Sequence, residues 1–161
     1  MVLGSVHFVE GWAFDDPDEM DGYRDLDIDG LWKRYFDQVA LAVSSGTFDV
    51  LAHPDLVKKF GFFPDADPVP FYRQTADVLA ASGIAVEVNA AGLRKPVGEI
   101  YPALAMLREC RRRGVPATMG SDAHAPSEVG SGLVRAREWL LEAGYRSVVV
   151  FRGRVPEEVS L

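Results

Sequence analysis

The stretch that decides the fold is Ala117-Thr118-Met119-Gly120-Ser121-Asp122-Ala123-His124. Its first residues predict a short apolar strand, and a carboxylate and an imidazole follow in the loop after it. Asp-x-His spacing at a strand end directs both side chains the same way, and both are ligands of divalent metal ions. The stretch therefore predicts a metal ion at the carboxyl end of a strand, with Asp122 and His124 as ligands.

The other two histidines of the chain, His7 and His53, also follow apolar segments that predict strands, at 2–6 and 48–52. In parallel α/β folds, functional side chains collect at the carboxyl ends of strands. Any one of these histidines alone would be interpreted as a hydrogen-bonded core side chain. Three at one rim favour metal binding, and a mixed imidazole and carboxylate set accepts Zn, Mn or Fe.

Strands and helices alternate along the chain. Helical apolar spacing covers 31–44, 71–82, 100–113 and 127–143, further strands are expected at 84–88 and 145–151, and a turn or short helix at 156–161. We expect Asp29 to cap the first helix and Ser127 the last. Near-continuous apolar strands between amphipathic helices predict an α/β fold with a parallel sheet, in a single domain of residues 1–161.

Composition excludes several classes of protein. The formal net charge of −7 argues against a general nucleic-acid-binding surface. The single cysteine, Cys110, excludes an internal disulfide and is typical of a reducing compartment. No apolar run approaches the ~20 residues that span a bilayer. We therefore expect a cytoplasmic protein that binds neither nucleic acid nor membranes.

Several polar residues in the same loops are candidates for substrate contacts. Arg94, Arg152 and Arg154 carry guanidinium groups, which match phosphate oxygens in two-point contacts, although solvated surface charge is the simpler interpretation of each. Asn89 could touch substrate or orient a ligand, and Glu87 beside it could equally be a packing residue. The sequence contains no Gly-x-Ser-x-Gly elbow, no phosphate-binding Gly-x-x-x-x-Gly-Lys and no Gly-x-Gly-x-x-Gly.

Together these motifs resemble a known family. The segments Gly4-Ser5-Val6-His7, Ala52-His53-Pro54-Asp55, Glu87-Val88-Asn89 and Gly120-Ser121-Asp122-Ala123-His124 are similar to the later motifs of the polymerase and histidinol phosphatase (PHP) superfamily. Asn89-Ala90-Ala91-Gly92-Leu93-Arg94-Lys95-Pro96 and Val149-Val150-Phe151-Arg152-Gly153-Arg154 resemble its histidinol-phosphate phosphatase branch. The resemblance covers almost the whole chain, with several separated motifs in the right order.

The resemblance implies a distorted (β/α)7 TIM-like barrel with up to three divalent metal ions on its rim. His7 and His53 would bind one metal, Asp122 a second and His124 a third, so Asp122 and His124 would also be the catalytic residues. The implied reaction is hydrolysis of L-histidinol phosphate, a small-molecule phosphate ester, to L-histidinol and phosphate in histidine biosynthesis. Metal-ion catalysis is the implied mechanism. Arg94, Asn89, Arg152 and Arg154 would be the substrate-binding residues.

One part of the family pattern is missing from the sequence. The family opens with a His-x-His strand and a glutamate that bridges two metals, and about five strands are counted here, too few to close a barrel. We therefore expect a partial barrel, truncated at the N-terminus, whose open edge allows self-association. The incomplete ligand set places the activity of this chain alone in doubt. The alternatives are a non-catalytic PHP module used for interaction, or a PHP phosphoesterase acting on another phosphate ester.

Overall fold

A four-stranded parallel sheet in the order β1-β2-β3-β4 forms the centre of the computed structural model, which describes all 161 residues. The strands are β1 (Leu3–Gly4), β2 (Val50–Leu51), β3 (Ala85–Asn89) and β4 (Ala117–Gly120). Neighbours in the sheet are also consecutive in the chain, so every connection is a crossover that carries a helix. The predicted α/β fold with parallel strands is confirmed.

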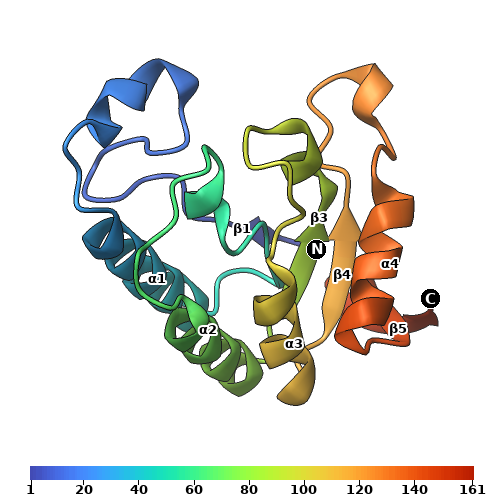
Figure 1. Cartoon of the computed structure of the whole chain (residues 1–161). Coiled ribbons are helices and arrows are strands. Elements are labelled where there is room, and N and C mark those ends of the chain that lie inside the picture. The colour runs from blue at the N-terminus through green and yellow to red at the C-terminus, as the bar shows by residue number, and fades with distance from the viewer.

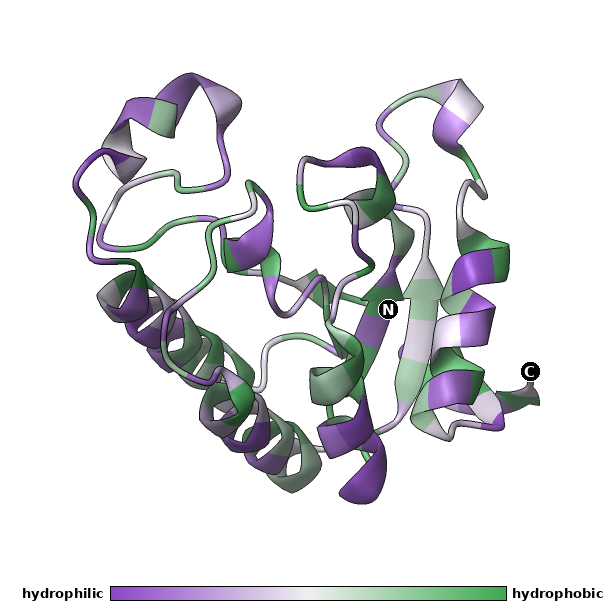
Figure 2. Cartoon of the chain, in the orientation of Figure 1, coloured by the Kyte–Doolittle hydropathy of each residue, from purple (hydrophilic) through white to green (hydrophobic).

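The helices are α1 (Ile28–Ser44), α2 (Val69–Ser82), α3 (Leu104–Arg112) and α4 (Leu133–Ala143). In Figure 1 the first three lie along one side of the sheet, and α4 lies next to β4. Polar and apolar residues alternate along α1 and α2 in Figure 2, as expected for helices with one buried face. None of the helices is long and apolar enough to cross a membrane.

The hydrophobic core lies between the sheet and these helices. The apolar residues that recur at helical spacing along α1 are buried, and Trp32 and Phe36 are among the largest fully buried side chains. All five residues of β3 are buried, because both faces of this strand are covered. The core thus holds β3 rigidly at the centre of the sheet.

The first helix begins earlier than its apolar spacing predicts. Asp27, and not Asp29, is its N-cap, and its carboxylate accepts a hydrogen bond from the backbone N–H of Gly30 at 2.9 Å. The preceding loop contains a short 3-10 helix at Pro17–Tyr23. The ring of Trp12 packs edge-on against that of Tyr23, so this tryptophan is a packing residue.

The last helix begins later than predicted. Only a 3-10 turn forms at Pro126–Glu128, and α4 starts at Leu133. Gly130 and Gly132 adopt φ angles of 77° and 78°, which are incompatible with a right-handed helix. Ser127 is therefore not the cap of the last helix.

The C-terminal segment forms a separate two-stranded antiparallel sheet of β5 (Ser147–Arg152) and β6 (Val155–Ser160). The predictions of a fifth parallel strand and of a terminal turn or helix are wrong. Gly153 and Arg154 connect the strands with positive φ angles, as a type I′ turn requires. This hairpin takes β5 out of the parallel sheet.

The first strand is shorter and more exposed than predicted. The segment 2–6 was expected to be a buried strand, but only Leu3 and Gly4 pair with β2, and Leu3 is 51% exposed. β1 is an edge strand with β2 as its one neighbour, so its outer backbone groups have no strand partner.

A buried ion cluster joins the loop after β2 to the segment before α3. The fully buried Nζ of Lys58 lies 2.9 Å from Asp55 Oδ2 and from Glu99 Oε2, and donates to the Ile100 carbonyl at 3.0 Å. The same carboxylate of Asp55 accepts the backbone N–H of Ala103 at 2.7 Å. Three acceptors satisfy all three ammonium donors, so these two segments are fixed to each other.

Candidate metal centre

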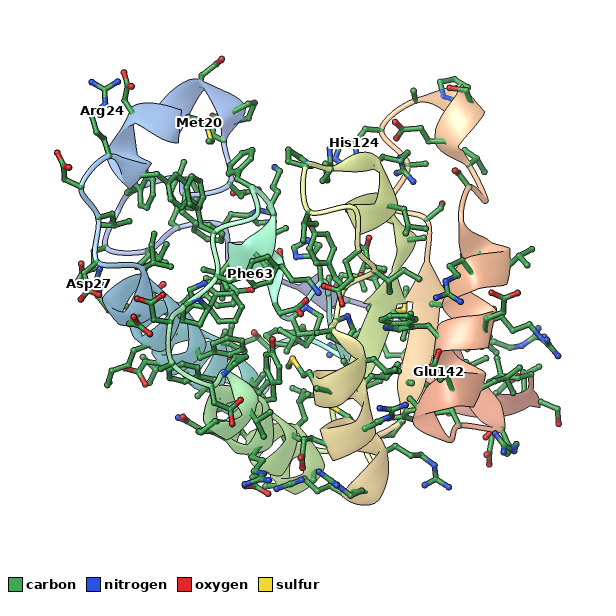
Figure 3. All side chains as sticks on the ribbon, viewed as in Figure 1. Met20, Arg24, Asp27, Phe63, His124 and Glu142 are labelled. Atoms are coloured by element: carbon green, nitrogen blue, oxygen red, sulfur yellow. The ribbon has the colours of Figure 1, made fainter.

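The predicted ligands lie in the loops at the carboxyl ends of the strands. His7 follows β1 and His53 follows β2, and their ring centroids are 5.1 Å apart at an interplanar angle of 71°. Asp122 and His124 follow β4. Figure 3 shows His124 at the upper end of the molecule, near the loops that follow β3 and β4. Parallel pairing therefore places the four residues at one rim, as the sequence predicts.

Glu87 lies beneath this rim and connects three strands. Its Oε2 accepts the backbone N–H of His53 at 3.3 Å and the amide of Asn89 at 2.9 Å. Its Oε1 would lie only 2.4 Å from a Cβ built on Gly120 in β4. Burial raises the pKa of Glu87, and the two hydrogen bonds oppose this shift.

His53 has the features of a neutral ligand held in place. It is 8% exposed, its φ is +31°, and its buried Nδ1 has no hydrogen-bond partner. Burial, and then the nearby His7, lower its pKa to about 4, whereas Asp122 and Asp15 act in the opposite direction. Neutral imidazole is the form that binds metals. Asp122 also has a positive φ, of 48°, and such backbone strain clusters at functional sites.

His7 is exposed and has a carboxylate partner. Its Nδ1 lies 3.1 Å from Asp15 Oδ2, and the ammonium of Lys59 contacts the same oxygen at 3.3 Å. Burial raises the pKa of Asp15, but the hydrogen bond and the charges of these two partners outweigh it and hold the pKa below its usual value. The sequence analysis missed Asp15, because nothing in the long loop before α1 distinguishes it from the neighbouring aspartates.

The loop that carries Asp122 and His124 is held by two residues of opposite charge. Arg94 Nη2 donates to the carbonyls of Ser121 at 2.9 Å and Asp122 at 3.2 Å. It also pairs at 3.3 Å with Glu128, whose carboxylate accepts the backbone N–H of His124 at 2.9 Å. The His124 side chain is 78% exposed, and its Nδ1 lies 3.9 Å from Asp122 Oδ1.

The four predicted ligands form two pairs. No three His, Cys, Asp or Glu side chains are grouped closely enough to hold one ion. The chemistry of the donors nevertheless suits a divalent cation, since a neutral imidazole with an unpartnered nitrogen, His53, lies beside a second imidazole and within the field of two carboxylates. His7 with His53, and Asp122 with His124, are the residues that would hold metal ions.

Two of the predicted substrate-binding arginines do not lie at this rim. Arg154 forms a two-point ion pair with Asp49, at distances of 2.9 to 3.1 Å. Asp49 directly precedes β2, so this pair lies at the amino ends of the strands, opposite the rim. Arg152 pairs with Glu157 across the C-terminal hairpin. The prediction fails because the hairpin turns both arginines away from the carboxyl ends of the strands.

Asn89 is also unsuited to a substrate contact. It is 1% exposed, its amide donates to Glu87, and its carbonyl oxygen accepts the backbone N–H of Ala91. Both polar groups of its side chain are therefore used inside the protein, and its role is to orient Glu87. Arg94 does lie at the rim, and its Nη1 has no partner.

The most prominent cavity is elsewhere. It has a volume of about 430 Å³ and lies near the amino ends of β4 and β5, where Arg111, Tyr145 and Arg146 line it. None of the predicted site residues reaches it.

The depressed pKa of His53 predicts a pH dependence of stability. In the metal-free chain, unfolded His53 takes up a proton near its ordinary pKa of 6.5, but the folded residue does so only near 4. The free energy of unfolding should therefore fall as pH drops from 6.5 to 4, by about 3 kcal/mol from this group. Urea unfolding of the wild type and of His53→Asn measures this contribution, since Asn tolerates a positive φ.

The difference between the two proteins gives the contribution of this one group. His53→Asn should lose about 3 kcal/mol of the wild-type pH dependence between the two pKa values. Identical pH profiles for His53→Asn and the wild type would contradict the burial of a neutral imidazole.

Comparison with known proteins agrees with this architecture. The family model described as PHP-associated matches residues 106–139. A probable histidinol-phosphatase of Deinococcus radiodurans is 44% identical over 154 residues, which are 95% of this chain and 58% of that protein. The chain thus spans rather more than half of the length of this curated relative.

A solved structure shares the fold. The histidinol phosphate phosphatase from Lactococcus lactis, crystallised with Zn, L-histidinol and phosphate, has a TM-score of 0.79 and 20% identity, covering 96% of this chain and 60% of that one. At this identity the likeness concerns the fold. The PHP-associated family model over residues 106–139 and the 44% identical relative show that the chain is similar to proteins of the histidinol-phosphatase branch of the PHP family.

Proposed function

We propose that this chain functions in a divalent-metal-dependent phosphomonoesterase that hydrolyses L-histidinol phosphate to L-histidinol and phosphate. The observation that carries the proposal is the 44% identity to a probable histidinol-phosphatase along 95% of the chain. The proposed setting is the cytoplasm and histidine biosynthesis, with a small phosphate ester as substrate. The net charge of −7 disfavours nucleic acid as an alternative substrate.

The proposed metals are Zn, Mn or Fe, up to three of them, and zinc is present in the Lactococcus lactis structure. His7 and His53 are proposed to hold one ion through imidazole nitrogen, while Asp122 and His124 hold others and are the catalytic residues. When bound, such ions stabilise the charge of a phosphoryl group and lower the pKa of water. This contribution is needed because Asp15, Asp122 and Glu128 otherwise oppose the approach of a phosphate.

Arg94 is the proposed substrate-binding residue at the rim. Its Nη2 is used by the loop carbonyls, and its Nη1 is buried without a hydrogen-bond partner, so Nη1 is the donor that we propose for a phosphate oxygen of the bound substrate. One guanidinium would then position both the substrate and the Asp122 loop. Asn89 and Glu87 support the same rim from below by holding the backbone of His53.

The proposal predicts metal-dependent activity that depends on the rim residues. The purified chain should bind zinc after chelator treatment, as measured by isothermal titration calorimetry, and His53→Asn or Asp122→Asn should weaken binding by more than about 100-fold. Release of phosphate from L-histidinol phosphate should require added metal. Asp37→Asn, which alters an exposed carboxylate on α1, is the matched control and should change neither quantity.

The two readouts separate the alternatives. Zinc binding without phosphate release would instead support a non-catalytic module, and release from other phosphate esters but not from L-histidinol phosphate would support a different phosphoesterase. Failure of the wild type to bind zinc, or phosphate release that persists in excess chelator, would contradict the proposal.

Arg94 and Arg154 form a matched pair for a second prediction. Arg94→Ala removes a charge-assisted hydrogen bond, worth ~1.5–3 kcal/mol, and should raise KM for L-histidinol phosphate by about 10-fold or more. It should lower kcat as well, because the Asp122 loop loses its guanidinium contacts. Arg154→Ala makes the same chemical change at the amino ends of the strands, away from the rim, and should leave KM unchanged. Equal effects of the two variants would remove Arg94 from the substrate site.

We also propose self-association through the open edge of the sheet. β1 has one unpaired side, and the side chains of Leu3 and Phe8 near it are 51% and 57% exposed. Sedimentation velocity should detect a dimer, and Leu3→Lys should shift it toward monomer. Leu41→Lys, on the exposed face of α1, should not. A wild type that is monomeric at high concentration would contradict this proposal.

A further inference from the structure

Asp15 makes more contacts to the rim than its position in a long loop suggests. Its Oδ2 lies 3.1 Å from Nδ1 of His7 and 3.3 Å from Nζ of Lys59, and the same ammonium also contacts the backbone carbonyl of Asp15. The Asp15 and Lys59 side chains are mostly buried, at 16% and 14% exposed. The loop before α1 and the segment after β2 therefore meet at one carboxylate.

This geometry determines which nitrogen of His7 carries the proton. An ionised carboxylate only accepts hydrogen bonds, so the Nδ1 that faces Asp15 must be the donor. In a neutral ring, the lone pair is then on Nε2, away from Asp15. The ammonium of Lys59, 3.3 Å from the same carboxylate oxygen, favours the ionised form of Asp15.

Lys59 holds Asp15 in position within the loop before α1. The loop between β1 and α1 forms no strand with the central sheet, and the ammonium contacts both the side chain and the backbone of Asp15. Lys59 follows the short 3-10 helix at Leu56–Lys58, adjacent in sequence to the fully buried Lys58. The anchor of Asp15 is therefore a rigid part of the core.

We propose that Asp15 is a positioning residue that selects the Nδ1–H tautomer of His7 and aims its Nε2 at a bound cation, and that Lys59 holds Asp15 in place. The role toward a cation rests on the proposed function. The tautomer assignment does not, because it concerns the metal-free chain. A carboxylate bound to the second nitrogen of a metal-ligating histidine orients the ring and increases its basicity.

Ring ¹⁵N NMR of the metal-free chain at mildly alkaline pH tests the tautomer. His7 of the wild type should show a protonated Nδ1 and an unprotonated Nε2. Asp15→Ala should lose this preference, and Asp15→Asn should retain part of it, because an amide oxygen still accepts a hydrogen bond. Lys59→Met should weaken the preference, since Asp15 loses its anchor.

Asp16→Ala is the matched control. Asp16 caps the 3-10 helix of the same loop through the backbone N–H of Asp18, so its removal loosens the loop and deletes one charge without touching His7. Asp16→Ala should keep the wild-type tautomer and zinc affinity, whereas Asp15→Ala should weaken zinc binding by about 10–100-fold.

These experiments test the tautomer of His7 and the role of Asp15 toward a cation separately. A wild-type His7 with its proton on Nε2, or equal effects of Asp15→Ala and Asp16→Ala on the tautomer, would overturn the assignment of Asp15. A selected tautomer with unchanged zinc affinity in Asp15→Ala would overturn its role toward a cation. A wild type that binds no zinc but shows the expected tautomers would contradict the proposed function and leave the tautomer assignment supported.

Discussion

One buried carboxylate sets the geometry of the rim. Glu87 accepts hydrogen bonds from the backbone of His53 at the end of β2 and from Asn89 on its own strand, and it occupies space beside β4 that only a glycine at 120 leaves open. A buried carboxylate without such partners would be strongly destabilising. The ends of three strands are thus held in register by the need to satisfy one polar group.

A second buried cluster extends this constraint outward from the strands. Lys58 and Asp55 follow His53 in the same loop and bind Glu99 and the backbone before α3. Buried ion pairs contribute little net stability, but the loss of one partner is costly, so they restrict which loop conformations are allowed. The loop of His53 is consequently fixed by Glu87 on one side and by Lys58 on the other, which allows the residue to remain at a strained positive φ.

Sequence patterns were sufficient for the parallel sheet and for the gathering of the histidines, because both follow from hydrophobic periodicity and from the common direction of parallel strands. These patterns were insufficient where a single backbone turn determines the direction of a strand or the start of a helix. Gly153 and Arg154 form a tight turn that folds β5 onto β6, and so Arg154 lies beside Asp49 and not at the rim. Gly130 and Gly132 delay α4 in the same way.

The hydrogen-bond partners of individual side chains were the other limit. Asp15 is one of several aspartates in its loop, and only the folded chain shows that it meets His7 and Lys59. Asn89 has a side chain typical of substrate contacts, but the structure uses both of its polar groups internally. Hydrophobic periodicity predicts which face of a helix or strand a residue occupies, but not which group forms hydrogen bonds with its side chain.

The two imidazoles of the rim reach a ligand-competent state by different physical means. Burial is the largest cause for His53 and the nearby His7 adds to it, so a pKa of about 4 keeps His53 neutral, and its buried Nδ1 has no partner. His7 is exposed, and the carboxylate of Asp15 beside its Nδ1 orients the ring instead. Two carboxylates near His53, Asp15 and Asp122, also create a negative field into which a phosphate could not enter alone. The same field attracts a divalent cation, so the feature that repels the free substrate is also the one that would concentrate the metal needed to bind it.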